Sequence, residues 1–420
     1  MTRVSAVADP AARGWRDRLR LVGPADGSRL AGLDGLRGIA VAYVVLDHAH
    51  VDGRLLHIFS IGGTAGVTTF FVLSGFLITS LLLREHDVRG RIDLPAFWGR
   101  RALRLLPGLW LWLAVTTLVF WQAGWTQLWF FVNNLVKPAL LYYADFEVLR
   151  RQLGPVQHTW SLAVEEQFYV VWPLLLIGLM VLVRRRARLA PAALVVVLLA
   201  LTLLAGWWRL RVGGEPGGAL AASRRPDTNA VSLLAGAALA AACRGGWRPP
   251  SWCRWLGWPA VVAMLVIPRL PGLATRFSTV NAVLMLTLLA VAAVLACLAP
   301  GSRVFTSGPL RSVGAISYGL YLWHVPLMTA YAGGLFRPLG NHRAATSVLI
   351  AIGAAAAAYA SFVLVERPLM RRYKKRLERV HLTQRPDVSP PPPPSPPAAA
   401  LATSSGSTAT RPAAPPSPRR

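Results

Sequence analysis

The chain has 420 residues, of which 54% are hydrophobic and 16 are tryptophan. One soluble core needs far fewer apolar residues, so the composition predicts an integral membrane protein. The formal net charge of +27 does not indicate nucleic-acid binding, because the basic residues alternate with long apolar runs instead of forming one basic domain. The three cysteines, Cys243, Cys253 and Cys297, lack metal-ligand spacing, so we expect no metal site and no disulfide framework.

Apolar runs that could cross a bilayer as helices begin after residue 30. A membrane-spanning helix needs about 20 largely apolar residues. The runs lie at 33–52, 61–83, 105–123, 163–183, 191–209, 229–243, 256–272, 279–299, 314–335 and 346–366. The stretch 125–143 is aromatic but interrupted by polar residues, which favours an interfacial segment over an eleventh span. The sequence therefore predicts an all-α polytopic membrane protein with about ten transmembrane helices.

The two ends of the chain are polar or of low complexity. Residues 1–30 are rich in arginine without a signal-peptide pattern and predict a cytosolic lead-in. The membrane domain is expected over 31–370, followed by a basic juxtamembrane segment at 371–384. Residues 385–420 are dominated by Pro, Ala and Ser and predict a disordered tail. Because the most basic loops alternate along the chain, the positive-inside rule places both termini in the cytosol.

Ionisable residues inside the first run are candidates for function, because charges within a span are costly. Arg37 and His48 are eleven positions apart, so they share one helix face and lie roughly 16 Å apart along its axis. Asp34 falls near this face, whereas His50 points almost the opposite way. An imidazole can accept a proton from a hydroxyl, and an arginine can hold a phosphate. The alternative is structural: His48 bridges neighbouring helices and Arg37 reaches the lipid headgroups.

A second polar group precedes the third run. Arg101 and Arg104 are three residues apart and therefore face the same way on a helix. They could bind the phosphates of a donor, or they could be ordinary flanking charges of a span. The spacing alone does not separate these two interpretations.

A third polar group, residues 158–169, begins with His158 at the start of the fourth run and includes Trp160, Ser161, Glu165, Glu166 and Tyr169. Ser161 can cap this helix, and acidic residues in its first turns suit the helix dipole. Two acids entering the membrane nevertheless exceed what a helix cap requires. We therefore expect these residues to line a cavity for an acceptor.

Three further polar residues lie near or within later runs. Asp227 precedes the sixth run, His324 lies in the ninth, and Glu366 ends the tenth. Each signal is weak when taken singly, because a helix-end charge or a residue bonded between helices gives the same pattern. Asp227 and His324 are included among the candidates that line the acceptor cavity.

Together these segments resemble the bacterial membrane acyltransferase 3 family. The resemblance rests on segments 33–38 with His48, 70–77, 100–107, 160–169, 318–326 and 366–368. It implies a multi-pass enzyme of the bacterial plasma membrane that passes an acyl group, often acetyl, from cytosolic acyl-CoA to a carbohydrate-type hydroxyl. The implied acceptors include surface polysaccharide of the cell envelope, peptidoglycan, glycolipid and sugar-bearing natural products such as macrolides.

The resemblance also implies roles for individual residues. It makes His48, paired with Arg37 in the motif, the essential catalytic residue and assigns Arg101 and Arg104 to the donor, with acyl-CoA as co-substrate and no other cofactor. Arg37, which can hold a phosphate, is our third donor-binding candidate. Asn229 departs from the pattern, because an arginine is frequent at that position, and this change bears on the choice of acceptor.

A transporter or flippase of a glycan or lipid-linked sugar is the alternative function, because charges inside spans also mark substrate pathways. No inverted repeat is evident in the sequence, which favours the enzyme.

Overall fold

A computed structural model describes residues 27–48, 62–124, 137–140, 144–147, 154–184, 190–267, 279–332, 334 and 343–373. The helices below belong to one compact unit of the chain, Met1–Arg371. No strand occurs in the described residues, which confirms the predicted all-α class for them. Residues 1–26 of the predicted lead-in, the tail, His50 and most of the stretch 125–143 lie outside the described residues, and residues 27–30 of the lead-in form the start of α2.

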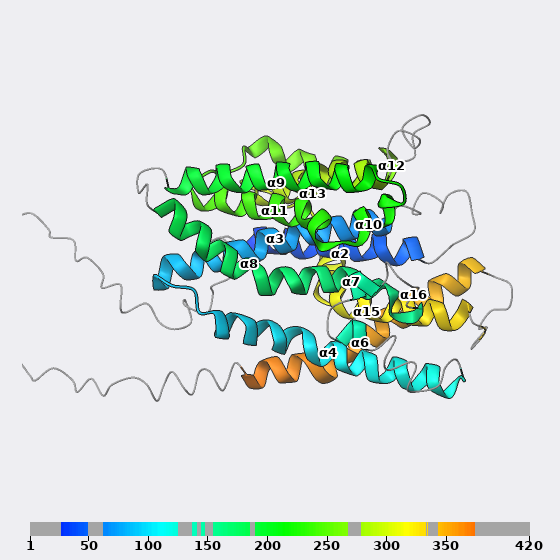
Figure 1. The fold of residues 1–420 in the computed structure, drawn as a ribbon. Coiled ribbons are helices and arrows are strands. Elements are labelled where there is room, and N and C mark those ends of the chain that lie inside the picture. The colour runs from blue at the N-terminus through cyan, green and yellow to red at the C-terminus, as the bar shows by residue number, and fades with distance from the viewer. Residues whose placement is uncertain are drawn as a thin grey trace, which may run out of the picture. The chain divides into compact units, whose positions relative to one another are not determined.

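The described elements are α-helices with a few short 3₁₀ and π segments (Figure 1). In chain order they are α2 (Gly27–His48), α3 (Gly62–Arg89), α4 (Leu94–Gln122), α6 (Lys137–Leu140), α7 (Ala144–Glu147), η4 (Gly154–Thr159), α8 (Trp160–Arg184), α9 (Ala190–Gly214), α10 (Gly218–Arg224), α11 (Pro226–Arg244), η5 (Ser251–Leu256), α12 (Gly257–Val266), α13 (Thr279–Leu298), α14 (Gly308–Ala315), α15 (Ser317–Ala332), α16 (Arg343–Ser361) and η7 (Phe362–Glu366).

Six helices in the described part of the chain are long and apolar enough to cross a membrane. They span Gly62–Arg89, Leu94–Gln122, Pro155–Val183, Ala192–Gly214, Asn281–Leu298 and Ala345–Tyr373. Helices also occupy the other four predicted runs, but α12 and α15 are short, with 10 and 16 residues. Helices α2 and α11 are long enough but less apolar than α13.

Helix α3 lies at the centre of the packed helices. It contacts α2, α11 and α13, and Figure 1 shows α2 and α3 between the group of α9, α11 and α13 and the group of α4, α15 and α16. The span of α3 is 72% buried inside the protein, against 28% for α9 and 22% for α16. Large apolar side chains on the outer helices are exposed, such as Leu203 on α9. Such a surface suits lipid tails, so the polar residues of interest lie where α2 and α3 meet their neighbours.

Glycines set the close approach of α3 and α11. A Cβ atom added at Gly75 would overlap the backbone carbonyl of Leu233, and one added at Gly236 would overlap that of Val72. Small residues at such crossings let helix backbones pack closely in membranes. Gly75 follows Ser74, so the same crossing fixes the position of a polar side chain on α3.

Candidate active site

Three histidines from three different elements form a histidine cluster, His48, His158 and His324. The rings of His48 and His324 are edge to face with centroids 5.1 Å apart, and those of His158 and His324 are 5.2 Å apart. His158 and His324 are buried, and His48 ends α2. Three imidazoles at these distances would repel one another if all were protonated. The cluster is therefore suited to hold neutral rings that take up one proton.

The backbone fixes the tautomers of two of these rings. Nδ1 of His48 lies 2.8 Å from the carbonyl oxygen of Val44, and Nδ1 of His324 lies 3.2 Å from that of Leu320. A carbonyl oxygen only accepts hydrogen bonds, so Nδ1 carries the proton in each neutral ring. Nε2 of His48 then bears the lone pair and can act as a base.

Tyr321 joins the histidine cluster to helix α8. Its hydroxyl donates to the backbone carbonyl of His158 at 2.9 Å, and the Ser161 hydroxyl lies 2.6 Å from the same oxygen. Because the single phenolic proton is given to the carbonyl, Ser161 is the donor in the second bond. The ring centroid of Tyr321 lies 5.4 Å from that of His158 and 5.5 Å from that of His324.

A narrow cavity of about 50 Å³ lies next to Tyr321. Its lining residues are Arg37, Val67, Phe70, Phe71, Ser161, Leu162, Glu165, Ser317, Tyr318 and Tyr321. This volume accommodates a few water molecules and is too small for a whole nucleotide or sugar. Nε of Arg37 is buried and has no hydrogen-bond partner in the described part of the chain. The cavity thus links a cation on α2 with the polar start of α8.

The predicted donor residues Arg37, Arg101 and Arg104 come together as an arginine cluster. Arg101 lies over the Tyr169 ring at 4.3 Å, and Arg104 is exposed within electrostatic reach of the other two arginines and of Asp34. None of the three forms an ion pair within 4 Å in the described residues. Adjacent guanidinium groups without carboxylate partners can bind a phosphate through charge-assisted hydrogen bonds.

The carboxylate of Glu165, which lies near the arginine cluster, is bound by hydroxyl groups and not by arginines. Glu165 accepts hydrogen bonds from Ser74 Oγ at 3.0 Å and from the Tyr169 hydroxyl at 3.1 Å. The two hydroxyl oxygens are themselves 2.9 Å apart. Arg37 and Arg101 remain within electrostatic reach of Glu165, and Glu166 lies within reach of Arg101. The carboxylate is therefore satisfied while the guanidinium donors stay available.

Neighbouring arginines without a place in this cluster are paired. Arg100 donates to Glu85 at 3.3 Å, and Arg89 binds the same carboxylate at 3.2 Å. Asp93 caps α4 by accepting from the backbone of Ala96 at 3.1 Å. These contacts hold the start of α4 so that Arg101 faces α8.

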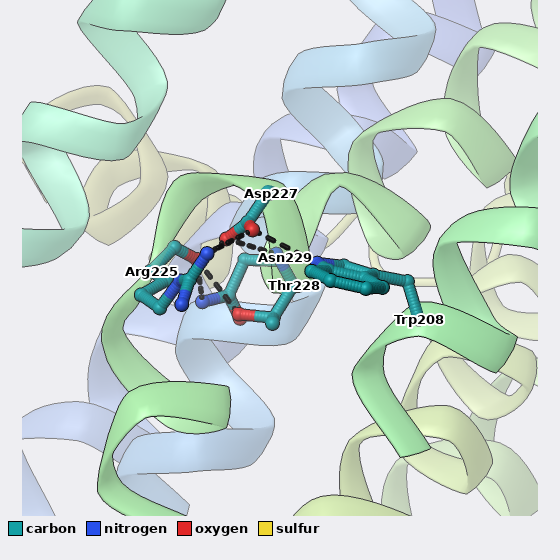
Figure 2. A network of polar contacts seen from close by, with 5 residues as sticks. All are labelled: Trp208, Arg225, Asp227, Thr228 and Asn229. Carbon is teal, nitrogen blue, oxygen red and sulfur yellow. Dashed lines mark hydrogen bonds and ion pairs between the residues drawn. The ribbon is translucent and has the colours of Figure 1, made fainter. Parts of the chain in front are cut away.

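Asp227 lies apart from this cavity, in the polar network of Figure 2. Its carboxylate binds the guanidinium of Arg225 at 2.6 and 3.0 Å and accepts from the Trp208 indole at 2.9 Å. Asn229, where the family resemblance leads one to expect arginine, donates to the backbone of Arg225 at 2.8 Å. This network fastens the junction of α10 and α11.

The sequence patterns placed His158 in the polar group at 158–169, but they gave no individual role to it or to Ser74, Tyr321 and Arg224. His158 begins the predicted group, but only the packing of η4 against α15 brings its ring to His324. Ser74 lies in the segment 70–77 that carries part of the resemblance, which was the available signal for it.

Comparisons with known proteins identify the relatives of this chain. A family model described as "Acyltransferase domain" matches residues 30–366. A putative peptidoglycan O-acetyltransferase of Bacillus subtilis is 30% identical over 81% of this chain and 55% of its own length. The peptidoglycan O-acetyltransferase of Listeria monocytogenes is 28% identical over 71% of this chain and 49% of its own, and a putative O-acetyltransferase of Staphylococcus aureus is 29% identical over 71% and 51%. No solved structure matches the chain significantly.

The apolar helices and the family match define a membrane protein with an acyltransferase domain. This chain belongs to the acyltransferase 3 family, as its motifs predicted. It spans about half the length of the curated relatives that it matches.

Proposed function

We propose that this chain is a membrane O-acyltransferase that transfers an acetyl group from acetyl-CoA to a hydroxyl of an envelope carbohydrate. The observation that carries this proposal is the separation of two kinds of group along α2. His48, with its Nε2 lone pair, lies in the histidine cluster, while Arg37 belongs to the arginine cluster about 16 Å away along the helix. The relatives are named as peptidoglycan O-acetyltransferases, which supports acetyl transfer and a carbohydrate acceptor.

The two clusters fit the two parts of an acyl-CoA molecule. Its phosphates bind Arg101 and Arg104, and its flexible arm carries the thioester past Arg37 toward the histidine cluster. A donor whose charges and reactive carbonyl are far apart matches a site whose cations and base are far apart. Substrate positioning of this kind lowers the entropic cost of the reaction.

His48 acts as general base in the direct form of the reaction. Nε2 takes the proton of the acceptor hydroxyl while its oxygen forms a bond to the thioester carbonyl carbon. The carbon–sulfur bond then breaks, and the imidazolium returns the proton to the leaving thiolate to give CoA and the ester. An acyl-histidine form, in which Nε2 attacks first and the acceptor hydroxyl second, uses the same residues.

The proposed topology follows from the charges of the loops. Ten helices cross the bacterial plasma membrane. Six are the strongly apolar spans, and the other four pack against neighbouring helices within the protein: α2, α11, α12 and α15. Both termini lie in the cytosol, so the arginine cluster opens to cytosolic acyl-CoA. The domain limits remain those predicted: 1–30, 31–370, 371–384 and 385–420.

Sealed membrane vesicles test the activity and the side of the donor together. Radiolabelled acetyl-CoA does not cross a bilayer, so inside-out vesicles of the wild type should label their glycan fraction, whereas right-side-out vesicles should not. His48→Ala vesicles, checked for equal amounts of folded protein, should stay unlabelled. Equal label with both proteins would remove His48 from the mechanism. Deletion of the gene tests the alternative function: glycan that is mislocalised but normally acetylated in the deletion strain would favour transport.

A further inference from the structure

Arg224 is a cation near the histidine cluster that the mechanism above does not use. It ends α10, and its guanidinium lies 4.6 Å from the centre of the Trp160 ring. It is partly buried and within electrostatic reach of Tyr321. Its Nε is buried and has no hydrogen-bond partner in the described chain, and the guanidinium forms no ion pair there. A buried donor without a partner costs free energy, so this one requires an explanation.

The neighbouring arginine shows the contrast. Asp227 binds one edge of the Arg225 guanidinium through Nε and one terminal nitrogen, and the backbone carbonyl of Arg225 accepts from Thr228 and Asn229 (Figure 2). The carboxylate of Asp227 therefore neutralises the charge of Arg225, and the network fixes the end of α10. It leaves Arg224 as a cation in a defined place without a counter-charge.

Contact with the face of the Trp160 ring positions Arg224 and uses none of its hydrogen-bond donors. The N–H groups of a guanidinium lie in its plane, so a ring beneath that plane orients the group and leaves its edge free for two parallel hydrogen bonds. Carboxylates and phosphates match this edge. The site is thus built for an oxyanion and not for a neutral hydroxyl alone.

The location assigns the oxyanion to the acceptor. Trp160 precedes Ser161, which bonds to Tyr321, and the Trp160 ring packs at 6.3 Å on Phe71, a residue that lines the cavity. Tyr321 in turn contacts the rings of His158 and His324. Arg224 therefore belongs to the histidine end of the site, away from the arginines proposed for the donor.

We propose that Arg224 determines acceptor specificity by binding the carboxylate or phosphate of an acidic saccharide whose hydroxyl approaches His48. This inference rests on the proposed function, because it takes the histidine cluster as the place of transfer. The same oxyanion chemistry occurs in an anionic lipid headgroup, and the test below separates the two sources.

The test measures binding without a donor, so it does not depend on turnover. The full chain in phosphatidylcholine nanodiscs is titrated calorimetrically with N-acetylmuramic acid and with its methyl ester, which carries a neutral ester in place of the carboxylate. A second pair, N-acetylglucosamine 1-phosphate and N-acetylglucosamine, tests phosphate. The variants are Arg224→Gln, Arg224→Lys and Arg254→Gln, because Arg254 also stacks on a tryptophan, Trp255, at 5.1 Å.

The wild type should bind at least one acid about ten- to hundred-fold tighter than its neutral partner, the range expected of charge-assisted hydrogen bonds. Arg224→Gln should bring the two members of that pair within about two-fold, Arg224→Lys should fall between, and Arg254→Gln should match the wild type. Equal binding of acid and neutral partner by the wild type, or discrimination retained in Arg224→Gln, would overturn the proposal.

Native mass spectrometry of the protein from membranes containing phosphatidylglycerol tests whether Arg224 binds an anionic lipid headgroup. Loss of bound phosphatidylglycerol in Arg224→Gln, with saccharide discrimination unchanged, would assign the site to lipid and also overturn the proposal. Saccharide discrimination that depends on Arg224, combined with no acetyl transfer by the wild type, would refute the proposed function and leave the anion site standing.

Discussion

The arginine cluster and the histidine cluster differ in how the protein treats charge. Arg104 is exposed and Arg101 is half-buried, and neither has a carboxylate at ion-pair distance in the described residues. His158 and His324 are buried, and their neighbours in the described residues are aromatic rings and backbone carbonyls. Cations that must bind a charged ligand gain from access to it, whereas a base gains from a place that excludes water. The contrast therefore separates binding from proton transfer.

Replacement of His48 should remove the base from the histidine cluster and leave donor binding at the arginine cluster unchanged. We expect His48→Ala to lower kcat for acetyl transfer by about 10²–10⁴-fold, the usual contribution of a general base, with the KM for acetyl-CoA within about two-fold of the wild type. Steady-state kinetics in nanodiscs measure both constants. A circular dichroism melt identical to that of the wild type controls for folding, and kcat within a factor of three of the wild type would contradict the role of His48.

Replacement of the donor arginines should produce the opposite kinetic pattern. Arg101→Gln and Arg104→Gln each remove a charge-assisted contact to a phosphate, so the KM for acetyl-CoA should rise by about 10- to 100-fold with a smaller change in kcat. Arg100→Gln is the matched control, because Arg100 pairs with Glu85 and does not join the cluster. An equal rise in all three variants would indicate a general effect of positive charge at the membrane surface.

The sequence predicts the position of each helix better than its surroundings. Helices occupy all ten predicted runs, yet α2 and α11 are less apolar than the outer helices. They pack against α3, so protein and not lipid covers much of their surface. Hydropathy alone does not separate a helix buried among other helices from one that faces lipid.

The candidate site shows the same limit. Helical periodicity places Arg37 and His48 on one face of α2, because that relation is internal to one helix. The contacts of Ser74 with Glu165 and of His158 with His324 join elements far apart in the chain. These pairs depend on how helices cross, which no spacing in a single sequence encodes. Asp227 illustrates the converse, since its motif suggested a cavity and the packing gave it a partner in Arg225.

The crossing of α3 and α11 should be sensitive to one methyl group. Gly75→Ala places a Cβ against the Leu233 carbonyl, so the helices must separate, which we expect to cost about 1–3 kcal/mol of stability. Gly178→Ala on α8 is the matched control, because nothing lies within 4 Å of its added Cβ. A thermal melt in detergent should show a lower midpoint for Gly75→Ala only. Equal midpoints would mean that the crossing has room to adjust.

The smallest effect should come from the hydroxyl that keeps Glu165 away from the arginines. Ser74→Ala removes one of the two hydroxyl donors to this carboxylate, and the unsatisfied oxygen can then turn to Arg37 or Arg101. A hydrogen bond of this kind is worth about 1 kcal/mol, so the KM for acetyl-CoA should rise by about five-fold. Thr202→Ala, which loses only a bond to its own helix at Leu198, controls for loss of a hydroxyl. An unchanged KM in Ser74→Ala would show that the arginines remain available without help from α3, and the division between the two ends would then rest on the arginine positions alone.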